Sequence, residues 1–478
     1  MTEPAKRSLV FARRAMGGTV VGTPAALATT RFAGAASDSR EVKPGRLFFA
    51  LPGERVDGFD FCAAAAQAGA AGLVVATGRG WPAGCSGIPV IAVADPRKAL
   101  GDLAAAVRKQ YRGRVVGVTG SNGKTTTKEL IAAALSPAGQ VLRTQGNLNT
   151  DVGLPLTVLE ATGKEDFWVL EMAMRAPGEI ALLSRIAEPH VALVTNVAAA
   201  HLGRLGSLDA VARAKGEIFA GLAPGGIAVL PIDEPRLEPE VARLPEARKR
   251  RFGFAGARAA QALVRSLVRI IEFIPAGVAG SLVRLSVGYQ PIVVRLPLAG
   301  EHNARNAAAA LAVSQALGVP LMPAAAALEG VTLPPHRSHV LSLGGRTLLD
   351  DCYNANPTSM SAALRTLVAS AGRFGRAFAI LGDMLELGDG AAALHQAIGE
   401  EAVKLGVAGL AVVGSLGAEI AEGAMAAGLP ASRAIALDDP EAAAQVVSSW
   451  SASGDWILVK ASRGMHLERA VAALQRKF

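Results

Sequence analysis

Short apolar runs separated by glycine-rich turns fill the first part of the chain. Three of these runs predict strands, over residues 47–51, 72–76 and 90–93. Short apolar runs bounded by turn residues are typical of strands. An alanine-rich stretch near 61–69 predicts a helix, and a second helix is expected over 96–111. We therefore expect a small α/β domain over residues 1–95.

Strand and helix patterns alternate in the middle of the chain, over residues 96–332. The expected strands are 115–118, 167–172, 191–195 and 227–230. Strands that alternate with helices predict a parallel sheet covered by helices on both faces. Residues 258–296 differ, because Val, Arg, Leu and Ile alternate there, and this alternation predicts antiparallel strands.

One uncharged stretch, residues 306–328, is long enough to cross a bilayer. It is mostly alanine, however, and it contains Pro320, Pro323 and several polar residues. Two buried helices joined at Val319 and Pro320 explain this composition better than a membrane span does. We therefore expect no membrane span.

The last part of the chain, residues 333–478, repeats the alternation of strands and helices. The expected strands are 347–350, 377–382, 410–414, 434–437 and 456–460. An alanine-rich helical stretch follows each of the first four, and a final helix is expected over 466–476. This order predicts a second doubly wound, Rossmann-like unit. The fold class is thus α/β with three domains, the middle one built on a parallel sheet.

Composition and charge narrow the function classes. The 478 residues are 51% hydrophobic and 19% charged, which excludes wholesale disorder. Three cysteines do not make a disulfide scaffold, no export signal is visible, and we expect a cytoplasmic protein. The net charge of +9 means that a nucleic-acid partner must be considered. The one dense basic run, residues 248–251, lacks interleaved aromatics, so we interpret it as a solvated face and expect no nucleic-acid partner.

A glycine-rich loop, TGSNGKTT at residues 119–126, follows an expected strand and precedes an expected helix. Such a loop turns backbone N–H groups toward phosphate oxygens at a helix N-terminus. Lys124 would reach the β- and γ-phosphates, and the Thr125 hydroxyl would bind Mg²⁺. Val118 stands where the commoner motif has its first glycine. The predicted nucleotide contacts are Gly120, Ser121, Asn122, Gly123, Lys124, Thr125 and Thr126.

Candidate metal ligands are fewer and individually ambiguous. Glu171 ends an apolar strand, where α/β sheets bind ligands, and its hard oxygens suit Mg²⁺, but it could be an ordinary strand-ending glutamate. His201 follows another strand and is either a metal ligand or a loop histidine. Lys215 lies in a helical pattern, and a lone helical lysine is ordinarily solvated.

The order of motifs resembles the Mur ligases, the ATP-dependent amide-forming enzymes of peptidoglycan precursor synthesis. The resemblance covers essentially the whole chain. It rests on DSR (38–40), PGRLFFAL (44–51), GERVDG (53–58), the loop at 119–126, GNLNT (146–150), GLPLT (153–157), YNANP (353–357), GDMLELG (382–388) and KASRGM (460–465). It implies a UDP-sugar-binding first domain, an ATP-binding middle domain and a last domain that brings the incoming dipeptide.

The resemblance also implies roles for single residues. Lys124 and Thr125 correspond to contacts with the phosphates and a first Mg²⁺, and Glu171 and His201 to ligands of a second Mg²⁺. Lys215 corresponds to a lysine that is carbamylated in this superfamily, and a carbamate there could help to hold the metal.

Four further residues are implied for the ATP site. Asn303 and Asn306 correspond to the adenine side, Asp351 to a ribose contact, and Arg337 to an interdomain arginine near the phosphates. With Lys124, Glu171, His201 and Lys215, Arg337 completes the candidate catalytic set. The candidate substrate contacts are Ser39, Arg40, Asn147, Asn149, Thr150, Asn354, Asn356, Lys460, Ser462 and Arg463.

The implied reaction joins D-alanyl-D-alanine to a UDP-N-acetylmuramoyl-tripeptide. A carboxylate is a poor electrophile, so ATP would first convert it to an acyl phosphate, which the dipeptide amine then attacks. Lys124 and two Mg²⁺ ions would neutralise the two anions that meet in this step. We expect a monomer that closes its domains to exclude water.

Three alternatives stay open at this point. The chain could be another amide ligase of the superfamily, adding the third residue or extending folate, although residues 146–150 and 353–357 argue against both. It could be a nucleotide switch or a nucleic-acid-stimulated ATPase. It could also be a non-catalytic binder of UDP-sugars. The intact candidate catalytic residues Lys124, Glu171 and His201 argue against that alternative.

Overall fold

The computed structural model describes residues 3–21, 24–53, 56–199, 205–256, 266–372 and 375–478, without the side chains of 24–26. The chain divides into two compact units. The first is Met1–Val118, Ala138–Ala192 and Glu217–Gly226, and the second is Thr119–Pro137, Leu193–Gly216 and Ile227–Phe478. The strands and helices form a mixed α/β fold, as the alternating pattern predicts. Among the described residues, no helix has both the length and the apolarity that crossing a bilayer requires.

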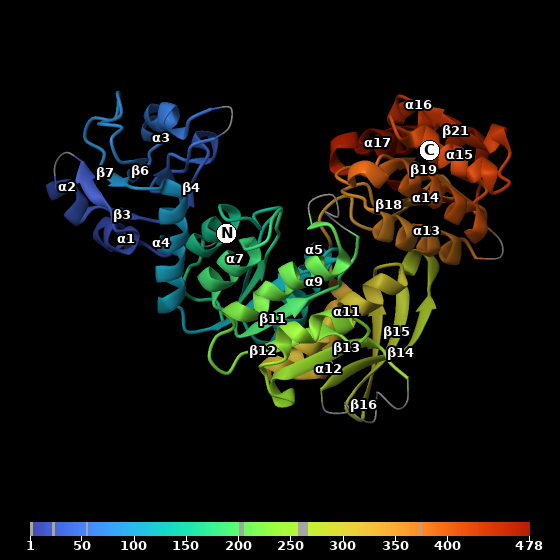
Figure 1. Ribbon diagram of the computed structural model, residues 1–478, viewed down its shortest axis with the longest axis horizontal. Coiled ribbons are helices and arrows are strands. Elements are labelled where there is room, and N and C mark those ends of the chain that lie inside the picture. The colour runs from blue at the N-terminus through green and yellow to red at the C-terminus, as the bar shows by residue number, and fades with distance from the viewer. Residues whose placement is uncertain (1–2, 22–23, 54–55, 200–204, 257–265, 373–374) are drawn as a thin grey trace. The chain divides into compact units, whose positions relative to one another are not determined.

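A five-stranded sheet forms the core of the N-terminal part (Figure 1). Its order is β2 (Thr19–Val21), β7 (Val90–Val93), β6 (Gly72–Ala76), β5 (Leu47–Phe49) and β4 (Ala35–Ala36). All neighbours are parallel except β2 and β7. The three predicted strands are therefore confirmed, whereas β2 and β4 have only two or three residues and leave no pattern to read. The helices are α1 (Leu9–Met16), α2 (Pro24–Thr29), α3 (Cys62–Gln67) and α4 (Pro96–Gln110), and β1 (Arg7–Ser8) pairs with β3 (Arg31–Phe32).

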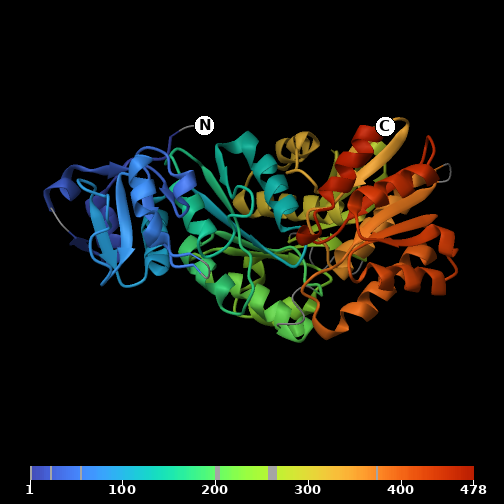
Figure 2. The same cartoon turned by 90° about the horizontal axis from the view of Figure 1, so that it is seen from above.

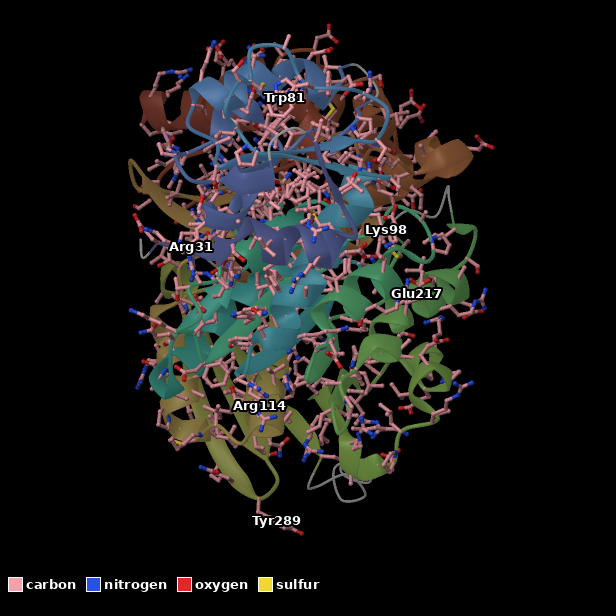
Figure 3. All side chains as sticks on the ribbon, turned by 90° about the vertical axis from the view of Figure 1, so that its left-hand side faces the viewer. Arg31, Trp81, Lys98, Arg114, Glu217 and Tyr289 are labelled. Atoms are coloured by element: carbon pink, nitrogen blue, oxygen red, sulfur yellow. The ribbon has the colours of Figure 1, made fainter. Side chains whose placement is uncertain are left out.

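The middle of the chain contributes a nine-stranded sheet. In chain order its strands are β8 (Arg114–Thr119), β9 (Val141–Arg143), β10 (Phe167–Glu171), β11 (Val191–Val194), β12 (Ile227–Pro231), β13 (Lys249–Phe254), β14 (Leu267–Pro275), β15 (Ser281–Val287) and β16 (Gln290–Leu296). The order in space is β16-β15-β14-β13-β12-β11-β8-β10-β9. The pairs of β14 with β15 and of β15 with β16 are antiparallel, as predicted. Residues 257–265 lie outside the described ranges. Tyr289, 90% exposed, projects from the β15–β16 turn (Figure 3).

The basic run at 248–251 is not a solvated face, and this prediction was wrong. The run enters β13, where Lys249 and Arg251 are each only 7% exposed. Arg251 Nη1 lies 2.8 Å from Glu246 Oε2, and Lys249 Nζ lies 2.6 Å from Glu246 Oε1. Hydrogen bonds from Arg251 and Lys249 lower the pKa of Glu246 to about 2. The cations could be buried because carboxylates on neighbouring turns pair with them, which the local pattern does not reveal.

Helices flank the strands of the middle part. They include α5 (Lys124–Leu135), α6 (Gly153–Leu159), α7 (Glu179–Ala187), α9 (Leu208–Gly216), α11 (Glu301–Leu317) and α12 (Leu321–Ala327). The uncharged stretch is indeed a helix pair, because α11 ends at Leu317, Gly318 caps it in a left-handed conformation, and α12 begins after Pro320. Buried alanines of α11 allow it to pack against α5, the helix that follows the glycine-rich loop.

The C-terminal part is the predicted doubly wound unit (Figures 1 and 2). Its sheet order is β17 (His339–Leu343), β18 (Arg346–Asp350), β22 (Trp456–Lys460), β19 (Ala377–Gly382), β20 (Gly409–Val413) and β21 (Ala434–Leu437). One face packs on α13 (Pro357–Ala371), α14 (Ala391–Leu405) and α15 (Gly417–Ala426), and the other on α16 (Pro440–Trp450) and α17 (Glu468–Lys477). Among the strands described in this part, only β17, a half-exposed antiparallel edge strand, escaped prediction.

Candidate active site

The glycine-rich loop joins β8 to α5 and needs its glycines. Gly120 has φ 150° and Gly123 has φ 76°, and α5 begins at Lys124. A Cβ on Gly120 would collide with the Thr195 hydroxyl, and one on Gly123 would lie 2.8 Å from Asn306 Oδ1. Only glycine fits both the conformation and the space at these two positions. The strand–loop–helix arrangement expected of a phosphate loop is therefore present.

The segment after β11 holds this loop in place. Asn196 accepts a hydrogen bond from Asn122 N through Oδ1 at 2.9 Å, and its own carbonyl accepts one from Ser121 N at 3.1 Å. The Thr195 hydroxyl donates to Asn122 O at 2.6 Å. Sequence reasoning missed Thr195 and Asn196. Their position directly after a parallel strand was the available signal.

Lys124 and the two threonines after it occupy the first turn of α5. The Lys124 ammonium donates to Gly120 O at 2.8 Å and to Ser121 O at 3.2 Å, so the loop's own carbonyls hold it over the loop. Thr125 and Thr126 are buried. A cation and a hydroxyl thus sit at the positive end of a 12-residue helix, an arrangement that favours polyanions.

Asn303 and Asn306 adjoin the same loop. Asn303 Nδ2 donates to Ala299 O at 2.8 Å, and Asn306 Nδ2 donates to Asn303 Oδ1 at 3.1 Å. Asn306 lies against Gly123, because a Cβ placed on Gly123 would be only 2.8 Å from Asn306 Oδ1. The structure therefore brings the predicted adenine-side asparagines to the predicted phosphate loop.

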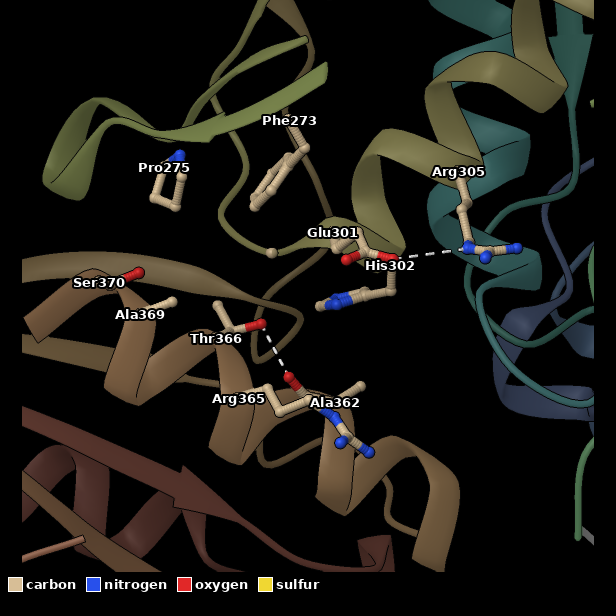
Figure 4. A pocket seen from close by; sticks show the side chains of 11 residues that line it. Phe273, Pro275, Glu301, His302, Arg305, Ala362, Arg365, Thr366, Ala369 and Ser370 are labelled. Atoms are coloured by element: carbon tan, nitrogen blue, oxygen red, sulfur yellow. Dashed lines mark hydrogen bonds and ion pairs between the residues drawn. The ribbon is translucent and has the colours of Figure 1, made fainter. Parts of the chain in front are cut away.

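A cavity of about 250 Å³ opens at the start of α11 (Figure 4). Phe273, His302 and Thr366 line it, together with Glu301, Arg305 and Arg365. Burial lowers the pKa of His302, so the ring is neutral at pH 7. Its Nδ1 is buried and has no hydrogen-bond partner among the described residues. The cavity thus offers an aromatic face and one unused polar atom to a flat heteroaromatic ligand.

Glu171 is tied to the 146–150 motif. It is 2% exposed at the end of β10. Asn149 Nδ2 donates to its Oε1 at 2.8 Å, and the Thr144 hydroxyl accepts from its backbone N at 3.0 Å. Thr144 is a second residue that sequence reasoning missed.

The other two metal candidates have different outcomes. Lys215 lies near the end of α9 and is 1% exposed, so the alternative of an ordinary solvated lysine is wrong. An amphipathic pattern does not distinguish a buried lysine from a solvated one, which is why the sequence left this open. His201 lies outside the described residues.

Three motifs of the C-terminal part meet at Ser462. Its backbone N donates to Asp383 O at 3.1 Å, and its hydroxyl donates to Ala355 O at 3.3 Å and accepts from Leu385 N at 2.9 Å. These contacts join YNANP, GDMLELG and KASRGM at the carboxyl ends of parallel strands, where such sheets bind ligands.

Lys460, which is buried, and Asp351, which is partly exposed, form an ion pair beside Ser462. Lys460 is 2% exposed, and its ammonium contacts the Asp351 carboxylate and Asn354 O. Asp351 also accepts from Ser338 N at 2.9 Å. Lys460 therefore fixes the segment that carries Asp351 and Asn354.

The guanidinium groups of two predicted arginines lie over the ring of Tyr353. The guanidinium carbon of Arg337 lies 3.8 Å from the centroid of its ring, and that of Arg463 lies 5.5 Å away. Both distances are within the range of cation–π attraction. The ring thus sets the positions of two cations from distant parts of the sequence.

Asn356 has two partners. Its side chain caps α13 by accepting from Ser359 N at 2.9 Å, and its Nδ2 donates to Asn122 Oδ1 at 2.6 Å. Asn122 Nδ2 in turn donates to Asn356 Oδ1 at 3.2 Å. YNANP and the phosphate loop are therefore linked directly.

Three family models match successive segments of the chain. Residues 31–108 match the Mur ligase family, catalytic domain; residues 118–314 match the Mur ligase middle domain; and residues 336–463 match the Mur ligase, glutamate ligase domain. A UDP-N-acetylmuramoyl-tripeptide–D-alanyl-D-alanine ligase of Bacillus subtilis is 37% identical, over 92% of this chain and 93% of that protein. The chain belongs to the Mur ligase family.

Solved Mur ligase structures share the fold. MurF from Acinetobacter baumannii superposes with a TM-score of 0.87 at 31% identity, covering 99% of this chain and all of that one. MurF ligase from Thermotoga maritima in complex with ADP superposes with a TM-score of 0.79 at 30% identity, covering 92% of this chain and 97% of that one. The predicted three-domain Mur ligase fold is confirmed, while the boundaries at 95 and 332 stay predictions.

Two candidate substrate residues of this Mur ligase, Ser39 and Arg40, lie in the N-terminal part, and Asn147 and Thr150 lie between β9 and α6 of the middle part. Arg40 is exposed and donates to both carboxylate oxygens of Asp38, which lowers the pKa of that carboxyl. Ser39 begins a short 3₁₀ turn beside it. Thr150 Oγ1 accepts from Gly153 N at 3.3 Å, and Asn147 is exposed.

Proposed function

We propose that this Mur ligase joins D-alanyl-D-alanine to UDP-N-acetylmuramoyl-tripeptide, with conversion of ATP to ADP and phosphate through an acyl phosphate. The relatives that match over most of the chain carry this ligase name. The observation that carries the proposal is the reciprocal amide pair of Asn122 and Asn356, which joins the phosphate loop to the YNANP motif. The pair brings a motif that argues for this ligase directly to the loop that would hold ATP.

The ATP site extends from the phosphate loop to the cavity at His302. The Lys124 ammonium and the N-terminus of α5 bind the phosphates, and they offset the repulsion between the γ-phosphate and the substrate carboxylate. The cavity receives the adenine, because its unpaired His302 Nδ1 and the Phe273 ring suit a flat base with polar edges. Asp351 and Arg337 contact the ribose and the phosphates.

The donor atoms fit Mg²⁺. The Thr125 hydroxyl and the Glu171 carboxylate are hard oxygen ligands on buried side chains. When bound, Mg²⁺ supplies charge neutralisation at the phosphates. His201 and Lys215 complete a two-ion set in this proposal. A lysine ammonium repels a cation, so Lys215 takes part as a carbamate, whose carboxylate-like oxygens reverse its charge.

The C-terminal motifs position the incoming dipeptide. Arg463, held over Tyr353, binds the carboxylate of the dipeptide, and the Ser462 contacts fix the surrounding loops. The amine then attacks the acyl carbon, the phosphate leaves with its bridging oxygen, and a proton passes from the amine to solvent. Ser39, Arg40, Asn147, Asn149 and Thr150 face the UDP-tripeptide in this proposal. The protein acts as a cytoplasmic monomer with no nucleic-acid partner.

The test is phosphate release with each component omitted in turn. We expect one phosphate per amide formed, only when ATP, Mg²⁺, UDP-tripeptide and D-alanyl-D-alanine are all present. Lys124→Ala should abolish release while the circular dichroism spectrum stays unchanged. Other dipeptides and single amino acids serve as matched acceptors. Release that DNA or RNA stimulates, or that needs no acceptor, would contradict the proposal.

A further inference from the structure

Three different donor atoms meet at the carboxyl end of β18. His336 Nδ1 lies 2.8 Å from Asp350 Oδ2, and Cys352 Sγ lies 3.2 Å from Asp350 Oδ1. The three donor atoms all lie within 4.8 Å of one another. Asp350 and Cys352 are buried and His336 is half-buried. None of the three belongs to the ATP or dipeptide contacts proposed above.

The spacing is close to that of a tetrahedral metal site. Ligands at the usual Zn–N, Zn–O and Zn–S distances stand about 3.4–3.6 Å apart. The two short separations here, each to a different oxygen of Asp350, would open by about 0.4–0.6 Å to reach these values. Because His336 lies on a loop, at φ 63°, it can make such an adjustment.

A fourth donor is close by. The Oε2 atom of Glu468, at the start of α17, is buried and has no hydrogen-bond partner among the described residues. The Glu468 carboxylate is near enough to Cys352 to act electrostatically on its thiol. Its other oxygen accepts from His466 Nδ1 at 3.3 Å. An unused carboxylate oxygen is the group that a cation would draw in.

The donor chemistry selects the ion. We propose that His336, Asp350 and Cys352 bind one Zn²⁺ or similar divalent transition-metal ion, with Glu468 or water as the fourth ligand. Sulfur and imidazole favour such ions, whereas Mg²⁺ takes hard oxygens and avoids thiols. Binding releases the thiol proton of Cys352 to solvent, because the thiolate is the ligand.

The site would act on the neighbouring ATP contacts. His336 directly precedes Arg337, and Asp350 directly precedes Asp351. An ion that joins His336 to Asp350 would hold both backbone segments in one arrangement. Because the ion binds the folded chain, it should also raise the thermal midpoint of the C-terminal part.

The test is a Co²⁺ titration of the full-length chain after removal of metals with a chelator. We expect one equivalent to bind with a thiolate charge-transfer band in the near ultraviolet, and Zn²⁺ to displace it with a dissociation constant of about 10 μM or tighter. A large excess of Mg²⁺ should leave the band unchanged. Absence of the band, or its loss to Mg²⁺, would overturn the proposal.

Variants assign the ligands. Cys352→Ser should abolish the band, and His336→Gly should weaken binding at least about 10-fold. Glycine suits the positive φ at position 336, so this variant removes a ligand without strain. Cys62→Ser, which alters another buried free cysteine, is the matched control and should bind like the wild type. A band that survives Cys352→Ser, or that is lost in Cys62→Ser, would contradict the assignment.

Discussion

Asn149 donates a hydrogen bond from Nδ2 to Oε1 of Glu171 at 2.8 Å, which joins the GNLNT motif to the carboxylate at the end of β10. Asn149 O also accepts from Ala173 N at 2.8 Å, so the motif and the strand end are held together twice. A motif that seemed to concern the substrate thus also orients a proposed metal ligand. This double role leads to the first prediction.

Asn149→Ala should lower kcat about 10-fold and raise the Mg²⁺ concentration needed for half-maximal activity. The reason is that a hydrogen bond to a charged group contributes about 1.5–3 kcal/mol, and its loss lets the Glu171 carboxylate turn. A Mg²⁺ titration of phosphate release measures the effect. Lys164→Ala, at an exposed loop position of the same unit, is the control. An unchanged Mg²⁺ curve for Asn149→Ala would separate Asn149 from the metal site.

Tyr353 should act through its ring rather than its hydroxyl. Tyr353→Phe keeps the face over which Arg337 and Arg463 lie, and we expect near wild-type kinetics. Tyr353→Leu removes it, and the KM for D-alanyl-D-alanine should rise about 5- to 10-fold, because each cation–π contact contributes about 0.5–2 kcal/mol. Steady-state kinetics of both variants decide this. Equal KM values for the two variants would show that the ring does not position Arg463.

The activity of the enzyme should depend on carbon dioxide, which would form the carbamate on Lys215. Chain depleted of bicarbonate should lose activity and regain it on addition, and ¹³C-bicarbonate should give a carbamate resonance in the NMR spectrum. Lys215→Ala should be inactive and partly rescued by short carboxylic acids, which restore an anion in the space that the side chain leaves. If neither bicarbonate nor carboxylic acids changed activity, the carbamate would be ruled out.

His190 makes stability depend on pH. Burial, with Arg108 and Arg114 nearby, lowers its pKa to about 4, and its Nδ1 accepts from Val115 N at 3.0 Å. Below about pH 6.5 the unfolded chain binds a proton at His190 that the folded chain does not bind. The free energy of unfolding is therefore unaffected by His190 above about pH 6.5 and falls as the pH drops toward 4. The loss is at most on the order of 3 kcal/mol, because His190 is partly exposed and solvent screens its charge.

The thermal midpoint measured from pH 7 to pH 4 checks this prediction. His190→Gln keeps an acceptor for Val115 N without a titrating group, so its midpoint should fall less steeply over this range. Parallel curves for the wild type and His190→Gln would show that other groups cause the acid sensitivity.

The sequence predicted features that local pattern encodes. The glycine-rich loop needs only its own residues and the adjoining strand and helix, so Gly120, Gly123 and Lys124 could be placed in advance. The alternating strands and helices of residues 333–478 could be predicted equally well from the local pattern. Only the half-exposed edge strand β17 was missed there, because its side chains do not alternate cleanly between core and solvent.

Other features depend on partners far away in the chain. Arg251 looked solvated because Glu238, which pairs with it at 3.0 Å, lies in a separate turn. The burial of Lys215 and the bracing of the phosphate loop by Asn196 also follow from tertiary packing. The link between Asn122 and Asn356 joins residues 234 positions apart, and no local pattern could have revealed it.

Transfer of oxygen from the substrate acid to phosphate tests the central claim most directly. UDP-N-acetylmuramoyl-tripeptide labelled with ¹⁸O in its terminal carboxylate is incubated with ATP, Mg²⁺ and D-alanyl-D-alanine, and the phosphate is examined by mass spectrometry. An acyl phosphate transfers one carboxylate oxygen to each phosphate released, so we expect one ¹⁸O per phosphate and an equal amount of lengthened peptide. Phosphate that carries oxygen only from water would contradict the account.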